Sequence, residues 1–296
     1  MNVDRVAEIA ATISLASGEA FRVARQFEVG GGCINRGLGL HGVDGRRYFV
    51  KLNQAARLEM FAAEFDGLAE LHAAAAIRVP LPLTYGEVPG NSFLVMEWLD
   101  LERVAWQAQA RLGEQLAGLH ATTWQGFGWW RDNTIGATPQ HNPLTPDWVT
   151  FFRDHRLRPQ LQWAARNGAS AGLLDGGQRL LDRLAEFFPG YAPPPSLLHG
   201  DLWGGNVGCC AGEPVVFDPA VYFGDRETDL AMTELFGGFS AAFHAAYAAV
   251  WPLDPGYATR KHVYQLYHLL NHFNLFGESY GRQSEGVIER LLAEIG

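Results

Sequence analysis

The sequence has few cysteines, no long apolar run and no tract of basic residues. Three cysteines occur among 296 residues, and Cys209 and Cys210 are adjacent. An odd count with a neighbouring pair is a poor framework for disulfides, so reduced thiols are expected. No apolar stretch approaches the roughly 20 residues that a membrane-spanning helix needs. The net charge of −9 argues against a nucleic-acid surface, which needs clustered Lys and Arg to neutralise phosphates.

The first residues also lack the pattern of a secretory leader. The stretch MNVDRVAEIAATIS carries acidic residues in place of a basic n-region and an apolar h-region. We therefore expect a cytoplasmic protein that binds neither membrane nor nucleic acid, as a monomer or a weak homodimer. Hydrophobic residues at 48% and charged residues at 19% are typical of a soluble globular protein. The length suits two lobes or one large domain.

The patterning of the chain changes near Trp98. Before it, a short helix, three strand-like runs separated by glycine, a longer helix and a strand pair are expected. Asp44 and Gly45 form a two-residue hairpin signal that places Lys51 on the third strand. After Trp98 the chain is mostly helical. The predicted helices cover 3–16, 55–75, 104–121, 148–167, 173–188, 229–250, 260–277 and 285–295, with a loop at 122–146 and a strand at 214–220.

A glycine-rich loop and a lysine on a following strand suit the binding of a nucleotide triphosphate. Backbone N–H groups approach phosphates closely only where side chains are small, and Gly30, Gly31 and Gly32 allow this approach. Lys51 supplies a point cation for the inner phosphates. A carboxylate on the next helix can hold that lysine in place, and we favour Glu64 over Glu59.

The stretch HGDLWGGN contains Asp201 and, five residues later, Asn206. Asp218 follows on a predicted strand. Magnesium takes oxygen ligands and keeps water, so Asn206 and Asp218 suffice beside the phosphates. Asp201 is then available to orient a substrate hydroxyl and accept its proton. A loop of turn-forming residues is the alternative for this trio.

These features, in this order, resemble the protein-kinase-like fold. HGDLWGGN stands in the place of the kinase catalytic loop, and FDPA stands in the place of its magnesium-binding D-F-G motif. The resemblance implies an α+β bilobal fold, with a small β-rich lobe at 1–97 that binds ATP and a larger, mostly helical catalytic and substrate lobe at 98–296. Glu97 and Leu99 would then offer backbone groups to adenine.

Four segments narrow the resemblance to the fructosamine-3-kinase, or ketosamine kinase, family. They are GGCINRG, YFVKLN, HGDLWGGN and FDPAVYFGDRETDLAM. The resemblance implies transfer of phosphate from ATP, with Mg2+, to the 3-hydroxyl of a small-molecule or protein-bound ketosamine. The product sheds its sugar and leaves a free amine, which is deglycation. Trp203 is expected to stack on or shape the sugar site, His199 to be structural, and Asp229 to cap its helix and brace the loop.

Other classes of protein fit less well. A dehydrogenase would place G-x-G-x-x-G at the start of a helix, whereas VGGGCINRG lies between strands. A metallophosphatase would need an upstream Asp-x-His pair, which we do not find. A pseudokinase would be expected to have lost Lys51, Asp201 or Asp218. The runner-up is another hydroxyl kinase of the same fold, acting on an aminoglycoside, on choline or on another sugar.

Overall fold

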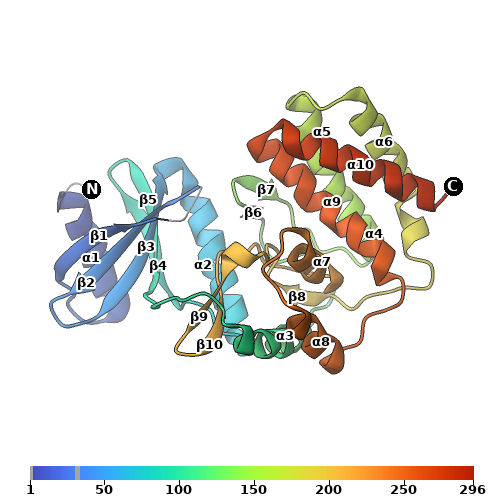
Figure 1. The fold of residues 1–296 in the computed structure, drawn as a ribbon. Coiled ribbons are helices and arrows are strands. Elements are labelled where there is room, and N and C mark those ends of the chain that lie inside the picture. Colours follow the sequence, from blue (N-terminus) through green and yellow to red (C-terminus); the bar gives the residue numbers. More distant parts are fainter. Residues whose placement is uncertain (1–2, 31–33) are drawn as a thin grey trace. The chain divides into compact units, whose positions relative to one another are not determined.

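The computed structural model describes residues 3–30 and 34–296, which form two compact units. The first unit comprises Met1–Ala108 and Val207–Pro219, and the second comprises Gln109–Asn206 and Ala220–Gly296. The chain can be followed from blue to red in Figure 1. The predicted domain division at residues 97 and 98 remains a proposal. The compact units instead interleave along the chain, because 207–219 returns to the first unit.

The first unit contains a five-stranded antiparallel sheet with the strand order β1-β2-β3-β5-β4. Side chains alternate between the faces of a strand, so Val50 and Leu52 point to one face and Lys51 to the other. Val50 and Leu52 are buried in a core that also contains Ile9 and Ile13. The strands are β1 (Val23–Val29), β2 (Arg36–Gly42), β3 (Arg47–Gln54), β4 (Pro82–Val88) and β5 (Asn91–Glu97).

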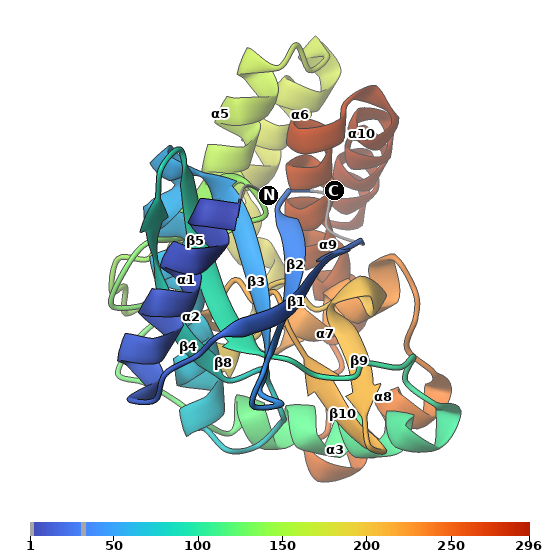
Figure 2. The same cartoon turned by 90° about the vertical axis from the view of Figure 1, so that its left-hand side faces the viewer.

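Two helices flank this sheet. Helix α1 (Val3–Ser17) supplies Ile9 and Ile13 to the core, and Figure 2 shows it lying across one face of the sheet. Helix α2 (Leu58–Ala73) packs beside β4 and β5 and carries Glu64. The remaining strands of this unit, β9 (Val207–Cys210) and β10 (Glu213–Val216), pair with each other. The sheet and α2 thus hold Lys51 and Glu64 on rigid elements.

The second unit is mostly helical. Two short antiparallel strand pairs accompany its helices: the hairpin of β6 (Asn133–Ile135) with β7 (Thr138–Gln140), and the long-range pair of β8 (Ser196–Leu198) with β11 (Tyr222–Gly224). The helices are α3 (Trp106–His120), α4 (Trp148–Phe152), α5 (Arg158–Arg166), α6 (Ala171–Asp182), α7 (Glu227–Leu235), α8 (Ala241–Val250), α9 (Tyr257–Phe276) and α10 (Glu278–Glu294). A π-helical segment, Arg153–Leu157, joins α4 to α5.

Several sequence expectations are confirmed and others are wrong. The turn at Asp44 and Gly45 joins β2 to β3, although its loop spans 43–46 and is longer than two residues. The continuous helix expected at 229–250 is wrong. Gly237 and Gly238 adopt φ values of 74° and 97°, and this left-handed backbone ends the helical path between α7 and α8.

Boundaries elsewhere also differ. The expected loop at 122–146 contains the β6–β7 hairpin, and the last helix begins at Glu278 rather than at residue 285. The helix expected at 173–188 ends at Asp182 and is followed by a 3-10 turn, Leu184–Phe187. Of the helices in the described residues, none is both long and apolar enough to cross a bilayer.

Candidate active site

Lys51 lies between two carboxylates within the first unit. Its ammonium nitrogen lies 2.6 Å from an oxygen of Asp218 and also binds Glu64. The side chains of Lys51 and Glu64 are only 8% and 11% exposed, whereas that of Asp218 is 45% exposed. Glu59, the alternative partner, is exposed on α2. The structure therefore brings together three residues that the sequence analysis chose separately.

The two carboxylates keep Lys51 charged. Burial alone would lower the pKa of Lys51, but attraction to Asp218 and Glu64 more than offsets burial and raises it. Burial raises the pKa of Glu64, and the neighbouring lysine opposes that rise. We take the cationic lysine as the dominant form, because two acidic groups surround it. It is thus a fixed positive charge.

Asp218 has an unusual backbone conformation. Its φ of 58° lies in the left-handed region, which is uncommon for residues other than glycine. Such positions persist where surrounding structure holds them, and they cluster at functional sites. Here the preceding strand is held by a bond of 3.0 Å from the N–H of Val216 to the carbonyl of Arg78. The carboxylate of Asp218 is thereby directed to Lys51.

The loop from His199 to Asn206, which we call the catalytic loop, is tightly bonded within the second unit. The Asn206 amide nitrogen donates to the backbone carbonyl of Asp201 at 2.9 Å and to its carboxylate at 3.3 Å. The N–H of Trp203 donates to the Asp201 carbonyl, and the N–H of Asn206 donates to the Trp203 carbonyl. The spacing of five residues is therefore a property of one compact turn.

Asp229 anchors the start of the catalytic loop. Its two carboxylate oxygens accept hydrogen bonds from the backbone N–H groups of His199, at 2.7 Å, and Gly200, at 2.9 Å. His120, fully buried, lies 3.2 Å from the same carboxylate. Burial would raise the pKa of Asp229, but its bond to His120 and the nearby charge lower it overall. The expected bracing role is therefore confirmed. The expected capping role is wrong, because Asp229 lies inside α7 and its carboxylate binds the loop. At the start of this helix, the N–H of Glu227 donates to the side chain of Asp225.

Two glycines in the loop are required by close approach. A Cβ on Gly200 would lie 2.0 Å from the carbonyl oxygen of Ala220, and φ is 82° there. A Cβ on Gly205 would lie 2.2 Å from the indole ring of Trp203. Trp203 therefore folds over Gly205, while 41% of its surface stays exposed. This exposure is compatible with the expected contact to a sugar.

Of the other predicted nucleotide contacts that the structure describes, Glu97 lies on the sheet of the first unit, whereas Gly30 and Leu99 lie just beyond strand ends. Gly30 is exposed directly after β1, and Gly31 and Gly32 lie outside the described residues. Glu97 ends β5, and its side chain binds Arg78 at 2.6 Å. The backbone carbonyl of Leu99 accepts from the N–H of Leu101. Their contact with a nucleotide stays a prediction.

Residues in the expected loop at 122–146 were missed. The side chain of Asn133 donates to the carbonyl of Val221 at 2.7 Å. Gln140 donates to the carbonyl of Ala220 and accepts from the hydroxyl of Tyr267 at 2.6 Å. These buried bonds hold the last residue of the FDPA motif, Ala220, and the residue that follows it. The sequence has no local signal for them, because each joins segments far apart in the chain.

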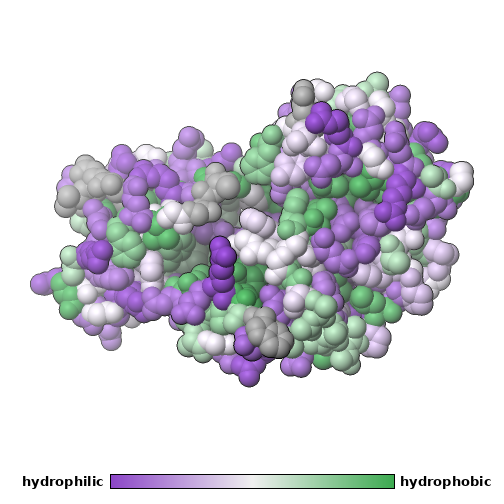
Figure 3. All heavy atoms as spheres, viewed as in Figure 1, coloured by the Kyte–Doolittle hydropathy of each residue, from purple (hydrophilic) through white to green (hydrophobic). Residues whose placement is uncertain are grey.

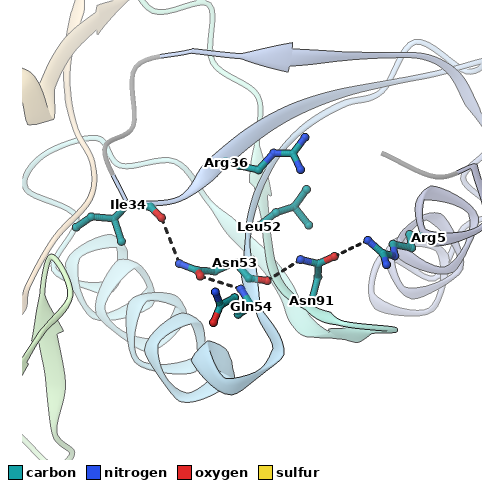
Figure 4. Close-up of a pocket in the computed structure, with 7 residues that line it drawn as sticks. All are labelled: Arg5, Ile34, Arg36, Leu52, Asn53, Gln54 and Asn91. Atoms are coloured by element: carbon teal, nitrogen blue, oxygen red, sulfur yellow. Dashed lines mark hydrogen bonds between the residues drawn. The ribbon is translucent and has the colours of Figure 1, made fainter.

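A polar cavity of about 280 Å³ lies at the ends of β2, β3 and β5. Figure 4 shows Arg5, Asn91, Asn53 and Ile34 linked in a row by hydrogen bonds. None of the predicted site residues that the structure describes lines this cavity. Its amide-bearing lining residues are bonded to their neighbours, and the cavity therefore does not coincide with the predicted site.

The donor set suits magnesium rather than a tightly held transition metal. No group of three or more His, Cys, Asp or Glu side chains in residues 3–30 and 34–296 is arranged to hold a metal ion. Asp218 offers a partly exposed carboxylate and Asn206 an amide oxygen. Magnesium commonly uses one or two such groups and takes its other ligands from phosphates and water. Each of these two groups is thus of the type that magnesium uses beside a nucleotide.

The fold and these side chains define the class of protein. The structure has the fold of protein-kinase-like phosphotransferases, and its structural neighbours include aminoglycoside phosphotransferases below 25% identity, which show the fold alone. A family model described as fructosamine kinase matches residues 5–294. The chain therefore belongs to the fructosamine kinase family and is a kinase that phosphorylates ketosamines.

Individual relatives match nearly the full length of the chain. A probable ketoamine kinase of Synechocystis is 48% identical over 96% of each chain. The chloroplastic protein-ribulosamine 3-kinase of Oryza sativa subsp. japonica is 39% identical, covering 94% of this chain and 82% of that protein. The crystal structure of a Haemophilus somnus protein described as a fructosamine-3-kinase superimposes on this structure with a TM-score of 0.89. The two sequences are 30% identical, and the match covers 96% of each chain.

Proposed function

We propose that the protein transfers the γ-phosphoryl group of ATP to the 3-hydroxyl of a ribulosamine or fructosamine, free or attached to a protein lysine. The observation that carries this proposal is the position of Lys51 between Glu64 and Asp218. A cation held in this way is what the inner phosphates of a nucleotide require. Membership of the fructosamine kinase family disfavours the aminoglycoside and choline alternatives.

Each residue has a defined task in this reaction. Lys51, oriented by Glu64, neutralises phosphate charge, and the glycine loop at 30–32 offers backbone N–H groups. Glu97 and Leu99 offer backbone groups to adenine. Asn206 and Asp218 would hold Mg2+, which would supply positive charge to neutralise the phosphates. Trp203 contacts the sugar.

Asp201 orients the acceptor hydroxyl. As the hydroxyl oxygen bonds to the γ-phosphorus, the bond from that phosphorus to the bridging oxygen breaks and ADP leaves. The hydroxyl proton passes to Asp201. Because the transition state is loose, most of the acceleration comes from positioning and charge neutralisation.

The two proposed metal ligands lie close to two of the chain crossings between the units. The chain leaves the second unit after Asn206 and leaves the first unit after Pro219, the residue following Asp218. Asn206 is held by Asp201, and Asp218 is held by Lys51. Both proposed ligands therefore sit next to points where the chain passes between units, and each is oriented by a different catalytic side chain.

We further propose that the enzyme acts in the cytoplasm on glycation adducts and that its product loses the sugar to release the amine. The described cysteines, Cys209 and Cys210, are free thiols, which agrees with a reducing compartment. Deglycation of this kind would return a lysine amine to its original state.

The test is ADP release by the purified protein with MgATP and one acceptor at a time. Ribulosyl-lysine and fructosyl-lysine are compared with choline and kanamycin, and Asp201→Asn serves as the control. Turnover with the ketosamines should fall at least about a hundredfold in Asp201→Asn, with ATP binding retained. Turnover with choline or kanamycin alone would overturn the substrate proposal, and near-normal turnover of Asp201→Asn would remove Asp201 from its role.

A further inference from the structure

A connected set of buried polar side chains leads to the catalytic loop within the second unit. We call it the anchor network, and it consists of Arg226, Tyr247, His120 and Asp229. Hydrophilic side chains usually lie at the surface, and Figure 3 shows them over much of the face in view. Each member of the anchor network is instead at most 5% exposed. Because a buried polar group costs free energy unless it is hydrogen-bonded, the partners of these side chains are specific.

Three contacts join the anchor network into one path. An Nη of Arg226 donates to the hydroxyl oxygen of Tyr247 at 3.0 Å. That hydroxyl lies 2.8 Å from the Nδ1 of His120, and the Nε2 of His120 lies 3.2 Å from a carboxylate oxygen of Asp229. Arg226 is itself held by the carbonyl of Pro252 at 2.6 Å. The imidazole therefore lies between the hydroxyl and the carboxylate, with one ring nitrogen facing each.

Close packing of two helices brings the hydroxyl to the imidazole. His120 ends α3 and Tyr247 lies on α8, and the two helices lie side by side (Figure 1). A Cβ on Gly113 of α3 would lie 2.3 Å from the carbonyl oxygen of Phe243 on α8. Gly113 and His120 are seven residues apart, which is about two helical turns, so they share one face of α3. Any side chain at position 113 would push α8, and with it Tyr247, away from His120.

The donors and acceptors of the anchor network fix the position of the imidazole proton. Burial lowers the pKa of His120 despite the opposing effect of Asp229, so the ring is neutral near pH 7 and carries a single N–H. The ionised carboxylate of Asp229 only accepts, so the proton lies on Nε2. Burial raises the pKa of Tyr247, which keeps its O–H. Because the Tyr247 oxygen accepts from Arg226, its own proton is available to Nδ1.

The path continues from Asp229 to Asp201. The carboxylate oxygen of Asp229 that faces His120 also accepts from the backbone N–H of His199 at 2.7 Å. Its other oxygen accepts from the N–H of Gly200. The ring Nδ1 of His199 in turn accepts from the backbone N–H of Asp201 at 3.3 Å. The N–H of His120 therefore restricts rotation of the carboxylate that holds the loop, two residues before Asp201.

We propose that His120 is a positioning residue for phosphoryl transfer: its Nε2–H orients Asp229, which holds the catalytic loop with Asp201 directed at the acceptor hydroxyl. This inference rests on the proposed function, because that function gives Asp201 its task. Tyr247 satisfies Nδ1 and fixes the orientation of the ring. The loss of this N–H should lower kcat rather than the affinity for ATP, because Lys51, the proposed phosphate contact, lies in the first unit.

The experiment replaces His120 by three residues that differ in where they offer a donor. The amide nitrogen of glutamine lies near the position of the imidazole Nε2, and that of asparagine lies near the position of Nδ1. Leucine fills the space without a polar atom. His120→Gln should keep kcat within about threefold of the wild type, less than the loss of one hydrogen bond to a charged group. His120→Asn and His120→Leu should lower kcat about tenfold to a hundredfold, the scale of a misplaced catalytic group.

The kcat values come from ADP release with MgATP and ribulosyl-lysine, and calorimetry with ATP measures nucleotide affinity, which should change less than about twofold in each variant. Urea unfolding checks that each variant is folded. The matched control is His141→Leu, which removes a ring that lies 2.8 Å from Asp132 in an exposed His–Asp pair and should keep the wild-type kcat. A merely structural role of His120 would lower stability without ranking the kcat values by donor position.

A second measurement needs no variant. In wild-type protein whose histidine rings carry the NMR-active isotope of nitrogen, the His120 signal, assigned through its backbone, should show a proton coupled directly to Nε2. A proton on Nδ1 would overturn the inference, because the ring would then offer Asp229 only a lone pair.

The outcomes separate the two proposals. Wild-type turnover of ribulosyl-lysine and fructosyl-lysine no higher than that of Asp201→Asn would overturn the proposed function and, with it, the positioning role. Normal wild-type turnover with equal losses in His120→Gln and His120→Leu would overturn the role of His120 alone. Near-normal kcat in His120→Leu, or a loss as large in His141→Leu, would do the same.

Discussion

The ammonium group of Lys51 lies 2.6 Å from a carboxylate oxygen of Asp218, although 167 positions separate the two residues in the chain. This contact joins β3 to the segment 207–219, which the chain inserts into the first unit. A half-exposed carboxylate held by a buried lysine can exchange that partner for a metal ion. The pair therefore places a cation and a proposed metal ligand in the same compact unit.

Lys51→Met should nearly abolish turnover and also destabilise the protein. Removal of the ammonium group leaves Glu64 buried without its cation, and breaking a buried pair costs about 3 kcal/mol. Urea unfolding and ADP release measure the two effects. The matched control is Lys261→Met, whose ion pair with Glu234 is partly exposed and should contribute only about 0.5 kcal/mol. Equal losses in the two variants would contradict the structural role of Lys51.

Asp229→Asn should reduce both stability and turnover while leaving every proposed substrate contact in place. One amide N–H would then face a backbone N–H of His199 or Gly200, at a cost of about 3 kcal/mol. We expect kcat to fall more than the affinity for ATP, because the variant loosens the loop that carries Asp201. Asp182→Asn, an exposed residue that accepts one bond from Gln178, is the control. A stable Asp229→Asn protein with normal kcat would show that the loop needs no anchor.

The buried His268 should make the protein less stable in mild acid. Burial lowers the pKa of His268 from 6.5 to about 3, so the unfolded chain binds a proton there that the folded chain does not. The folded state therefore loses stability as the pH falls below about 6.5, by up to about 1.4 kcal/mol per pH unit, until the pH approaches about 3. Above pH 6.5 this contribution vanishes, because both states are neutral.

The measurement is urea unfolding at pH 7.5 and pH 5.5. The wild type should lose about 1.4 kcal/mol more than His268→Gln over this interval, because the other titrating groups are common to both proteins. Identical losses would mean that His268 becomes protonated in the folded state.

The local parts of the site were predictable from the sequence. The lysine strand and the Asp201 to Asn206 interval each depend on a few consecutive residues, and the turn signal at Asp44 and Gly45 placed Lys51 on the third strand. The helix expected across Gly237 and Gly238 failed for a local reason. Apolar residues continue at helical spacing on both sides, and their periodicity concealed two glycines in a left-handed conformation.

Such local patterns could not predict contacts between residues that are far apart in the chain. Asn133 and Gln140 read as loop residues, since nothing nearby in the chain shows that their amides bind the carbonyls of Val221 and Ala220. The return of 207–219 to the first unit depends on bonds from Cys209 to Glu102 and from Val216 to Arg78. These are backbone bonds, which any residue type except proline as a donor can make.

The sequence by itself determined which chemical groups the protein has and their order along the chain. Strands, turns and the Asp201 to Asn206 interval can be recognised because each depends on a few consecutive residues. Only the tertiary structure decided which of these groups meet. It paired Lys51 with Asp218, anchored His199 and Gly200 on Asp229, and brought Phe236 to His272. The physical reason is that hydrogen bonds and ring contacts act over a few ångströms in space, whatever the separation along the chain, and only packing of the whole core brings distant segments that close.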